Sequence, residues 1–387
     1  MQQEYPSMII LGVTGSVGKQ AVDVALMHGV RVDALSANTN VSETEKMVRK
    51  LCPKACAMAD EQSAKDLAIR ISDLPVKVYS GAQGICQMIG DTDSESNRQV
   101  VVNSILGQAG LAPTMTTLKS GKQLALANKE SLVVAGELVM PLAKKQGIDI
   151  LPVDSEHCAI YQCLRSGDKK EIKRIMLTAS GGPFYGYTRE QLEGVTKQKT
   201  LAHPTWNMGA KITVDSATMM NKGFEVMEAK WLFGVGAEDI EVVVHPQSVI
   251  HSMVQFEDGA IKAQLGTPDM RLPIMYALTY PRRLESSFSR IDWTTLKELT
   301  FETPDLEIFP NLQHAYTALS HGGNMPCVVN AANEICVAAF LNDRIGFTDM
   351  PKLIERAMQS TPYILKPTLQ DYLETDKEVR RMVSEWV

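Results

Sequence analysis

The spacing of apolar residues along the chain changes twice, and it divides the sequence into three regions. Up to about residue 153, short apolar runs alternate with stretches whose apolar positions recur at helical spacing. The strand-like runs are Ser7–Gly12, Val30–Ser36, Ala55–Met58, Val76–Tyr79, Gln99–Asn103, Gln123–Ala127 and Ile148–Val153. Strands that alternate with helices indicate a mostly parallel sheet with helices on both faces. We therefore predict an α/β domain over residues 1–153.

Two helices of this first region have readable ends. Helical spacing covers Val17–His28 directly after the first strand. Ser42 followed by Glu45 has the pattern of a capping box, so we expect the next helix to begin there and to end before Pro53.

From about residue 154 to 285 the alternation is replaced by an α+β pattern. The expected strands are Ile172–Thr178, Ile240–His245, Val249–Phe256 and Ala260–Leu265. The turn Glu257-Asp258-Gly259 joins the last two as a hairpin. We predict that Gln198–Ala210 is a loop and that Asp215 is the N-cap of one helix that runs through Phe233 to Gly234.

The last region carries only helical patterns. Residues 286–310 lack a clear period and form an expected linker, and residues 311–387 an expected helical bundle. Its helices are Asn311–Ser320, Cys327–Asn342, Met350–Gln359 and Leu369–Trp386. We thus predict three domains: 1–153, a central α+β catalytic domain at 154–285, and the helical domain.

Composition narrows the possible partners. The 387 residues are 44% hydrophobic and 22% charged, which is typical of a globular protein, and the net charge of −6 disfavours nucleic acid. We expect no membrane partner, because no apolar stretch reaches about 18 residues. The seven cysteines are scattered, and no export signal is visible in MQQEYPSMII. We therefore expect a reduced, cytoplasmic protein.

Gly12, Gly15 and Gly18 follow the first strand and open the first helix. Glycines there permit a tight turn and close approach of a pyrophosphate to a helix amino end, so we predict a Rossmann-like nucleotide site. An NAD site usually has a carboxylate at the end of the second strand, whereas this chain reads Ser36-Ala37-Asn38-Thr39-Asn40. That stretch favours NADP, although no arginine follows it to bind the 2′-phosphate.

An acidic pair, Asp154 and Glu156, follows the strand-like run IDILPV. If the chain stays extended there, both carboxylates project to one side with Ser155 opposite. With a third carboxylate, such hard oxygen donors suit Mg²⁺ or Mn²⁺. A solvated acidic turn is the alternative.

Asn221, Lys222 and Glu225 share one face of their predicted helix. We expect Ser216 near the helix start, where its hydroxyl and a free backbone N–H could bind an anion. The face is therefore a candidate phosphate site beside a metal carboxylate, although spacing alone also admits Glu228 as the ligand.

Three further segments carry candidate chemistry. Lys129 follows a strand and could reach a substrate oxygen, or it could be a surface lysine. Ser180 opens a flexible Ser-Gly-Gly-Pro turn. The polar loop with His203 contains Trp206, whose exposure is unfavourable unless the loop closes over a ligand.

These motifs together resemble those of the 1-deoxy-D-xylulose 5-phosphate reductoisomerase family. The resemblance spans nearly the whole chain and rests on ordered blocks: Gly12–Gly18, ANKES at 127–131, LPVDSEH at 151–157, ASGGPF at 179–184, HPTWNMG at 203–209, KITVDSATMMNKGFE at 211–225, HPQSVIHSMV at 245–254 and NAANE at 330–334. It implies conversion of 1-deoxy-D-xylulose 5-phosphate to 2-C-methyl-D-erythritol 4-phosphate in non-mevalonate isoprenoid synthesis. The expected chemistry is a metal-assisted skeletal rearrangement, followed by reduction with NADPH, in a homodimer.

The resemblance also implies roles for individual residues. Asp154, Glu156 and Glu225 match the divalent-metal ligands, which favours Glu225 over Glu228. Lys129 matches a catalytic residue that contacts substrate. The other expected substrate contacts are Ser155, Ser180, His203, Ser216, Asn221 and Lys222, with Trp206 as a lid. The expected NADPH contacts are Thr14, Gly15, Ser16, Val17, Asn38, Asn40, Asn128, Glu130 and Gly209.

One departure from the family pattern concerns the cofactor. Many members carry a basic residue where Thr39 stands, so the preference for NADPH over NADH is open. Two other functions remain as alternatives: a semialdehyde dehydrogenase, which would need an activated cysteine, and a catalytically silent NADP-binding sensor.

Overall fold

The computed structural model describes residues 5–94, 96, 98–206 and 208–387, which form two compact units. The first unit comprises residues up to 131, together with 139–158 and 269–288. The second comprises residues 132–138, 159–268 and 289–387. The domain boundaries expected from the sequence remain a prediction.

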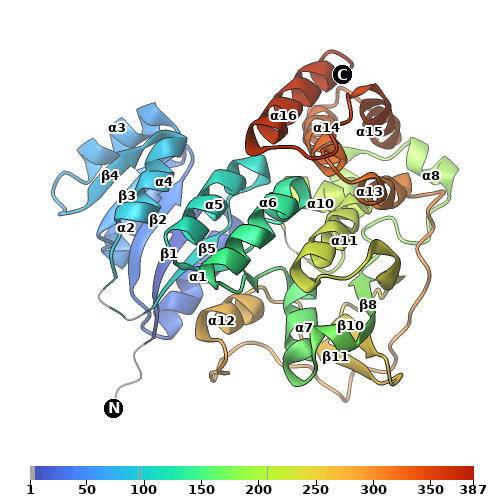
Figure 1. The fold of residues 1–387 in the computed structure, drawn as a ribbon, viewed down its shortest axis with the longest axis horizontal. Coiled ribbons are helices and arrows are strands. Elements are labelled where there is room, and N and C mark those ends of the chain that lie inside the picture. Colours follow the sequence, from blue (N-terminus) through green and yellow to red (C-terminus); the bar gives the residue numbers. More distant parts are fainter. Residues whose placement is uncertain (1–4, 95, 97, 207) are drawn as a thin grey trace. The chain divides into compact units, whose positions relative to one another are not determined.

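The first unit contains a seven-stranded sheet in the order β4-β3-β2-β1-β5-β6-β7, and every neighbouring pair is parallel (Figure 1). The strands are β1 (Ser7–Leu11), β2 (Val32–Ala37), β3 (Ala55–Met58), β4 (Lys77–Ser80), β5 (Gln99–Asn103), β6 (Gln123–Leu126) and β7 (Leu151–Pro152). The central strands β1, β2 and β5 are buried along their whole length, as expected for a parallel sheet covered on both faces. The parallel sheet is therefore confirmed.

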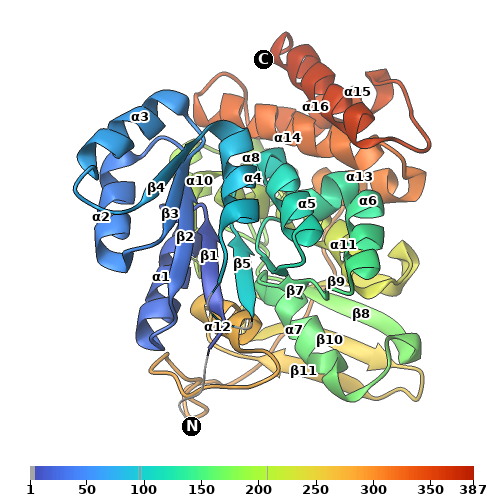
Figure 2. The ribbon, with the colours of Figure 1, turned by 60° about the vertical axis from the view of Figure 1, so that its left-hand side comes forward.

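The chain builds this sheet outward from β1 to β4 and then returns to place β5 on the other side of β1. The helices of this unit are α1 (Ser16–Met27), α2 (Val41–Leu51), α3 (Glu61–Arg70), α4 (Gly81–Asp91), α5 (Leu111–Lys119) and α12 (Arg271–Thr279). In the packing, α4 contacts α5 while α1 contacts α12 (Figure 2). The reversal creates a switch point between β1 and β5, where open α/β sheets bind ligands at the carboxyl ends of their strands.

One local prediction in this unit was wrong, and one helix was not predicted. The cap of α2 is Asn40, whose side chain accepts a hydrogen bond from the backbone N–H of Glu43, and not Ser42. Asn40 directly precedes the first helical residue, which is the position from which a side chain can cap a helix. Helix α12 was not predicted, because its all-round apolar composition gives no helical stripe.

The second unit contains a four-stranded sheet in the order β11-β10-β8-β9. Its strands are β8 (Ile172–Ala179), β9 (Ile240–Val244), β10 (Ile250–Phe256) and β11 (Ile261–Leu265). The predicted hairpin between β10 and β11 is confirmed, and β10 is also antiparallel to β8. Because β8 pairs parallel with β9, the sheet is mixed.

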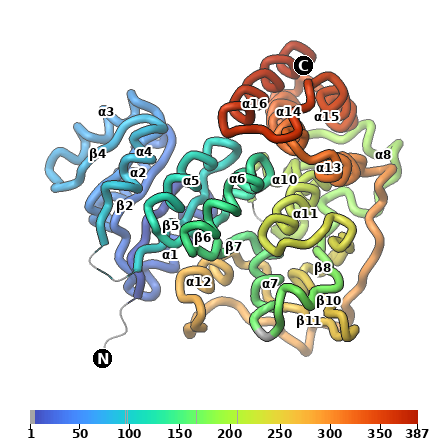
Figure 3. The backbone as a smooth tube through the Cα atoms, viewed as in Figure 1, coloured from blue at the N-terminus to red at the C-terminus, as the bar shows by residue number. Residues whose placement is uncertain are grey.

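The helices of the second unit fall into two groups. Four helices follow β8 in the sequence and precede β9: α8 (Arg189–Glu193), α9 (Lys197–Leu201), α10 (Ala210–Ala217) and α11 (Met220–Phe233), the last of which contacts both of these strands. The carboxyl-terminal helices are α13 (Pro310–His321), α14 (Met325–Leu341), α15 (Asp349–Ser360) and α16 (Leu369–Ser384). Helix α14 contacts the other three, which confirms the predicted helical region, and residues 289–309 lead into it without a helix (Figure 3).

Two predictions in the second unit need correction. The segment expected as a loop begins with helix α9, which Thr196 caps through the N–H of Lys199. The single helix expected from Asp215 to Phe233 is two helices, and Asp215 lies inside α10. The break falls at Met219, which has a left-handed φ of 61° although no glycine or proline marks it.

Two helices contribute residues to both units: α6 (Glu130–Gln146) and α7 (Ser155–Cys163). Four short 3₁₀ segments complete the regular structure: Gly107–Gly110, Leu164–Ser166, Lys169–Glu171 and Ala237–Asp239. No helix in the described ranges has the length and apolar character needed to cross a membrane.

Candidate active site

The glycine loop joins β1 to α1 at the switch point of the parallel sheet. Gly12 has a φ of +81°, and a Cβ there would lie 2.9 Å from the carbonyl oxygen of Ser104. A Cβ on Gly18 would collide with the carbonyl of Gly12. The loop therefore needs glycine at both positions. Helix α1 begins after Gly15 without a side-chain cap, so its first N–H groups can bind an anion.

The predicted NADPH contacts of this loop lie at its surface. Gly15 and Ser16 are exposed, and Thr14 and Val17 are partly exposed. Asn38 and Thr39 are also exposed, directly after β2. The Oδ1 atom of Asn40 caps α2, so of its side-chain amide the NH2 group is the part that could contact a ligand.

Asn128 and Glu130 follow β6 and are buried. The side-chain amide of Asn128 donates to the carbonyl oxygens of Ile105 and Gly107, at 2.7 and 2.8 Å, and to the carboxylate of Glu130. Asn128 therefore fixes the loop that follows β5, beside the glycine loop. Its amide group is already committed to this structural role.

Lys129 and Asp154 form an ion pair at the carboxyl ends of β6 and β7. Their Nζ and Oδ2 atoms are 2.9 Å apart, and the two side chains are only 8% and 10% exposed. An ammonium group and a carboxylate held this close in a largely desolvated place interact more strongly than they would in water. Lys129 is therefore a fixed member of the acidic site rather than a solvated surface lysine.

The geometry expected for the acidic pair was wrong. Strand β7 ends at Pro152, and α7 begins at Ser155, so the chain does not stay extended through Glu156. Asp154 instead caps this helix, because its Oδ1 accepts the backbone N–H of Glu156 at 3.1 Å. The hydroxyl of Ser155 donates to the carboxylate of Glu156. The two acidic residues thus lie at a helix amino end, which favours negative charge.

In the second unit, Asn221, Lys222 and Glu225 lie on one face of α11, as the sequence predicted. Asn221 donates to one carboxylate oxygen of Glu225 at 2.5 Å, and the Lys222 ammonium contacts the other. The side chains of Lys222 and Glu225 are 6% and 1% exposed. Buried charges are stable only when they are paired, so this face is a preorganised polar cluster.

Ser216 lies in the last turn of α10, and not near a helix start as predicted. It is partly exposed, although its neighbours Asp215 and Ala217 are buried. The turn after β8 packs against the end of α10 at Ser216. Gly182 has a φ of +69°, and a Cβ there would lie 2.9 Å from the carbonyl oxygen of Ser216.

The same turn carries Ser180, which contacts His203. The Nδ1 atom of His203 accepts the backbone N–H groups of Thr205 and Trp206, at 3.1 and 3.0 Å. A nitrogen that accepts carries no hydrogen, so neutral His203 is protonated on Nε2 and donates to Ser180 Oγ, 3.2 Å away. Burial lowers the pKa of His203, which favours this neutral form.

The hydroxyl of Ser180 consequently has a defined direction. Its oxygen accepts from His203 Nε2 and from the backbone N–H of Gly182, at 3.2 Å. With both lone pairs used, the single O–H hydrogen is left for another acceptor. Ser180 is therefore arranged as a donor.

Trp206 is partly exposed and lies 6.2 Å, ring centre to ring centre, from the buried His251 of β10. His251 was not among the predicted site residues; a histidine within an apolar strand was the available signal. Gly209, an expected cofactor contact, is exposed at the start of α10. Asn207, within the expected loop, lies outside the described residues.

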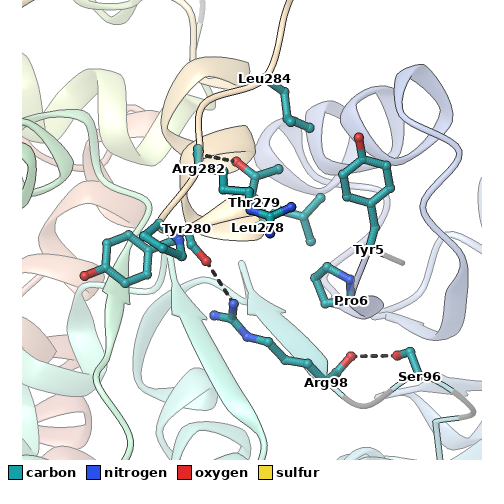
Figure 4. Close-up of a pocket in the computed structure, with 10 residues that line it drawn as sticks. Tyr5, Pro6, Ser96, Arg98, Leu278, Thr279, Tyr280, Arg282 and Leu284 are labelled. Atoms are coloured by element: carbon teal, nitrogen blue, oxygen red, sulfur yellow. Dashed lines mark hydrogen bonds between the residues drawn. The ribbon is translucent and has the colours of Figure 1, made fainter. Parts of the chain in front are cut away.

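A cavity of about 300 Å³ in the first unit is separate from these residues (Figure 4). It is lined by Tyr5, Pro6, Ser96, Arg98, Leu278, Thr279, Tyr280, Pro281, Arg282 and Leu284. Arg98 donates to the carbonyl oxygen of Tyr280 at 2.9 Å. Pro6 and Arg98 precede β1 and β5, so the cavity lies at the amino ends of the strands, opposite the glycine loop.

Models of one protein family match the chain in three successive blocks. Residues 8–136 match 1-deoxy-D-xylulose 5-phosphate reductoisomerase, residues 150–233 match its C-terminal domain, and residues 265–382 match the DXP reductoisomerase C-terminal domain. A protein of this name from Phocaeicola vulgatus is 56% identical over 375 residues, which are 96% of this chain and 97% of that protein. The chain belongs to the 1-deoxy-D-xylulose 5-phosphate reductoisomerase family.

Other reductoisomerases agree over their full length. The Bacteroides fragilis protein is 55% identical over 380 residues, covering 98% of this chain and 97% of its own. The solved Zymomonas mobilis reductoisomerase in complex with NADPH has a TM-score of 0.90 and 40% identity, with 99% of both chains covered. A reductoisomerase structure with NADPH, fosmidomycin and magnesium has a TM-score of 0.92 and 38% identity, with 98% of both chains covered.

These matches confirm the family, the fold class and the enzyme class that the sequence predicted. The roles of individual residues are not tested by them.

Proposed function

We propose that this chain converts 1-deoxy-D-xylulose 5-phosphate to 2-C-methyl-D-erythritol 4-phosphate with NADPH and a divalent metal ion, using the residues that the sequence predicted. The observation that carries the proposal is full-length membership of the reductoisomerase family, combined with intact polar clusters around Asp154 and Glu225. The roles below follow from the chemistry of those clusters.

Asp154, Glu156 and Glu225 would hold the metal ion. The donor set fits Mg²⁺ or Mn²⁺, because all three are carboxylates, the hard oxygen ligands that these ions prefer. A bound ion supplies Lewis acidity at the ketone of the substrate. Lys129 and Lys222 each contact one of these carboxylates, so they orient the ligands.

NADPH would bind at the glycine loop. The amino end of α1 would bind the pyrophosphate, and the exposed residues from Thr14 to Val17 would contact it. Asn38 and Asn40 would lie beside the adenosine end. Asn128 and Glu130 would shape the neighbouring loop, and Gly209 would contact the cofactor through its backbone.

Ser180, Ser216, Asn221 and Lys222 would bind the substrate phosphate. Ser180 has its O–H hydrogen available, and Lys222 supplies a buried ammonium group, so both present donors to an anion. Ser155, His203 and Lys129 would contact the rest of the substrate. Phosphate binding far from the reacting carbons can drive closure of the loop that carries Trp206.

The cysteines argue against the semialdehyde dehydrogenase. That chemistry needs a thiolate, which burial disfavours. Burial raises the pKa of Cys56 and Cys336 to about 12 and that of Cys163 to about 11. Cys52 is exposed, but it lies at the end of α2, outside the polar clusters.

The assembly and the location belong to the same proposal. We infer a homodimer from the family resemblance, which light scattering at known concentration would test. We infer the cytoplasm as its location, consistent with seven free cysteines.

The test is oxidation of NADPH in the presence of 1-deoxy-D-xylulose 5-phosphate and Mg²⁺ or Mn²⁺, followed by absorbance. We expect turnover that stops on addition of EDTA and returns with excess metal. Turnover insensitive to the chelator would contradict the metal-assisted mechanism. Absence of NADPH consumption with metal and substrate present would favour the silent sensor.

A further inference from the structure

Asp215 is a buried charged residue to which neither the motifs nor the proposed mechanism assigns a role. It lies inside α10, directly before Ser216, and its side chain is 2% exposed. A buried carboxylate is costly unless other groups compensate its charge, so its partners show what it holds in place.

Two partners contact Asp215 from different sides. Lys211, one turn earlier on α10, places its Nζ 3.0 Å from Oδ2. Asn333 of α14, which is fully buried, donates its side-chain amide to Oδ1 at 2.7 Å. The bond to Asn333 joins helices that are separated by more than one hundred residues in the sequence, and it is charge-assisted.

Lys211 extends this connection to α11. Its Nζ lies 5.2 Å from the centre of the Phe224 ring, which is completely buried beside Glu225. A chain of contacts therefore connects α14, α10 and α11. It runs from Asn333 to Asp215, from Asp215 to Lys211, and from Lys211 to Phe224. We call these four residues the Asp215 network.

The Asp215 network lies beside the junction of α10 and α11, whose relative orientation sets the positions of Ser216 and Lys222. Ser216 lies in the last turn of α10, and Asn221 and Lys222 lie in the first turn of α11, with the left-handed Met219 between the two helices. A break of this kind can bend, because no continuous ladder of helical hydrogen bonds crosses it. Contacts outside the break, added to the few hydrogen bonds within it, help to keep Ser216 in register with Lys222.

We propose that Asp215 and Asn333 are positioning residues for substrate phosphate: their hydrogen bond fixes the end of α10 so that Ser216 and Lys222 bind the same anion. This inference rests on the proposed function, since it takes Ser216 and Lys222 as phosphate contacts. It adds helix α14 to the machinery for substrate binding, although none of the proposed substrate contacts lies on that helix.

The test is the substitution Asn333→Leu, which keeps the side-chain volume and removes the donor. Asn330→Leu is the matched control: Asn330 is equally buried on α14, one turn earlier, and donates at 3.1 Å to Glu334 on its own helix. Both variants are compared by steady-state kinetics and by thermal unfolding. If Asn333→Leu does not fold, Asp215→Asn replaces it, because that change keeps the shape and removes the charge.

We expect Asn333→Leu to raise the KM for 1-deoxy-D-xylulose 5-phosphate about tenfold over Asn330→Leu, since small misplacements of binding groups are costly. The KM for NADPH should not change. A KM for the sugar phosphate equal to that of the control would overturn the proposal, as would equal rises in both KM values. Lys222→Ala separates the two hypotheses: if it also leaves this KM unchanged, the phosphate site itself is wrong.

Discussion

At the scale of single residues, hydrogen-bond direction determines what the site can donate. His203 accepts two backbone N–H groups on Nδ1, so its proton is on Nε2, and Ser180 is turned toward a ligand. This arrangement depends on His203 remaining neutral. Protonation would add a hydrogen to Nδ1, which would then face the N–H groups of Thr205 and Trp206, donor against donor.

The titration of His203 should therefore show a pKa below the ordinary 6.5, as burial directs. Because the unfolded chain binds this proton more readily, the stability that neutral His203 contributes is present above pH 6.5 and is lost as pH falls through the folded pKa. Histidine NMR of wild type and His203→Asn would assign the resonance. A pKa at or above 6.5 would contradict the burial of a neutral imidazole at this position.

The cofactor loop permits a second prediction at this scale. Thr39 is exposed directly after β2, next to the exposed Asn38. Introducing Thr39→Arg should tighten NADPH about tenfold relative to NADH, because a guanidinium binds a phosphate through charge-assisted hydrogen bonds. Fluorescence titration with both nucleotides measures this, and Thr39→Gln controls for length. An equal effect of the neutral glutamine would show that charge is not the cause.

At the scale of elements, the sequence predicted strands better than helix ends. The strands Ala55–Met58 and Gln99–Asn103 were placed to the residue, because a continuous apolar run bounded by polar residues admits few alternatives. The break at Met219 could not be predicted, since no residue type marks it and tertiary contacts impose it. The shared face of Asn221 and Glu225 was nevertheless correct, because it depends only on helical spacing.

In the candidate site, too, local sequence patterns predicted some features and could not predict others. Asp154 was found as a candidate ligand from its place after a strand, but its capping of α7 required knowing where the helix begins. The contact between Asp215 and Asn333 joins residues far apart in the sequence, which no local pattern reveals.

The turn after β8 provides a test at this scale. Gly182 and Gly186 both have a positive φ, but only at Gly182 would a Cβ meet α10; around Gly186 there is open space. Gly186→Ala should cost about 1 kcal/mol through backbone strain alone. Gly182→Ala should cost more and should also raise the KM for the sugar phosphate, because it displaces Ser216. Urea unfolding measures the loss of stability of each variant, and steady-state kinetics measures its KM. Equal losses of stability with an unchanged KM would contradict the close packing of Gly182 against Ser216.

At the scale of the whole molecule, the three proposed metal ligands are far apart in the sequence. Asp154 and Glu156 follow strand β7, whereas Glu225 lies on α11, so a single metal ion would take its ligands from distant parts of the sequence. The central claim is therefore that all three carboxylates serve a single ion.

Binding of Mn²⁺, followed by electron paramagnetic resonance in the presence of 1-deoxy-D-xylulose 5-phosphate, tests this claim most directly. Wild type should bind one ion per chain, and Asp154→Asn and Glu225→Gln should each weaken that binding on the order of 100-fold, because each removes a charged ligand. If either variant binds Mn²⁺ as tightly as wild type does, the three carboxylates do not share an ion, and the proposed mechanism is wrong.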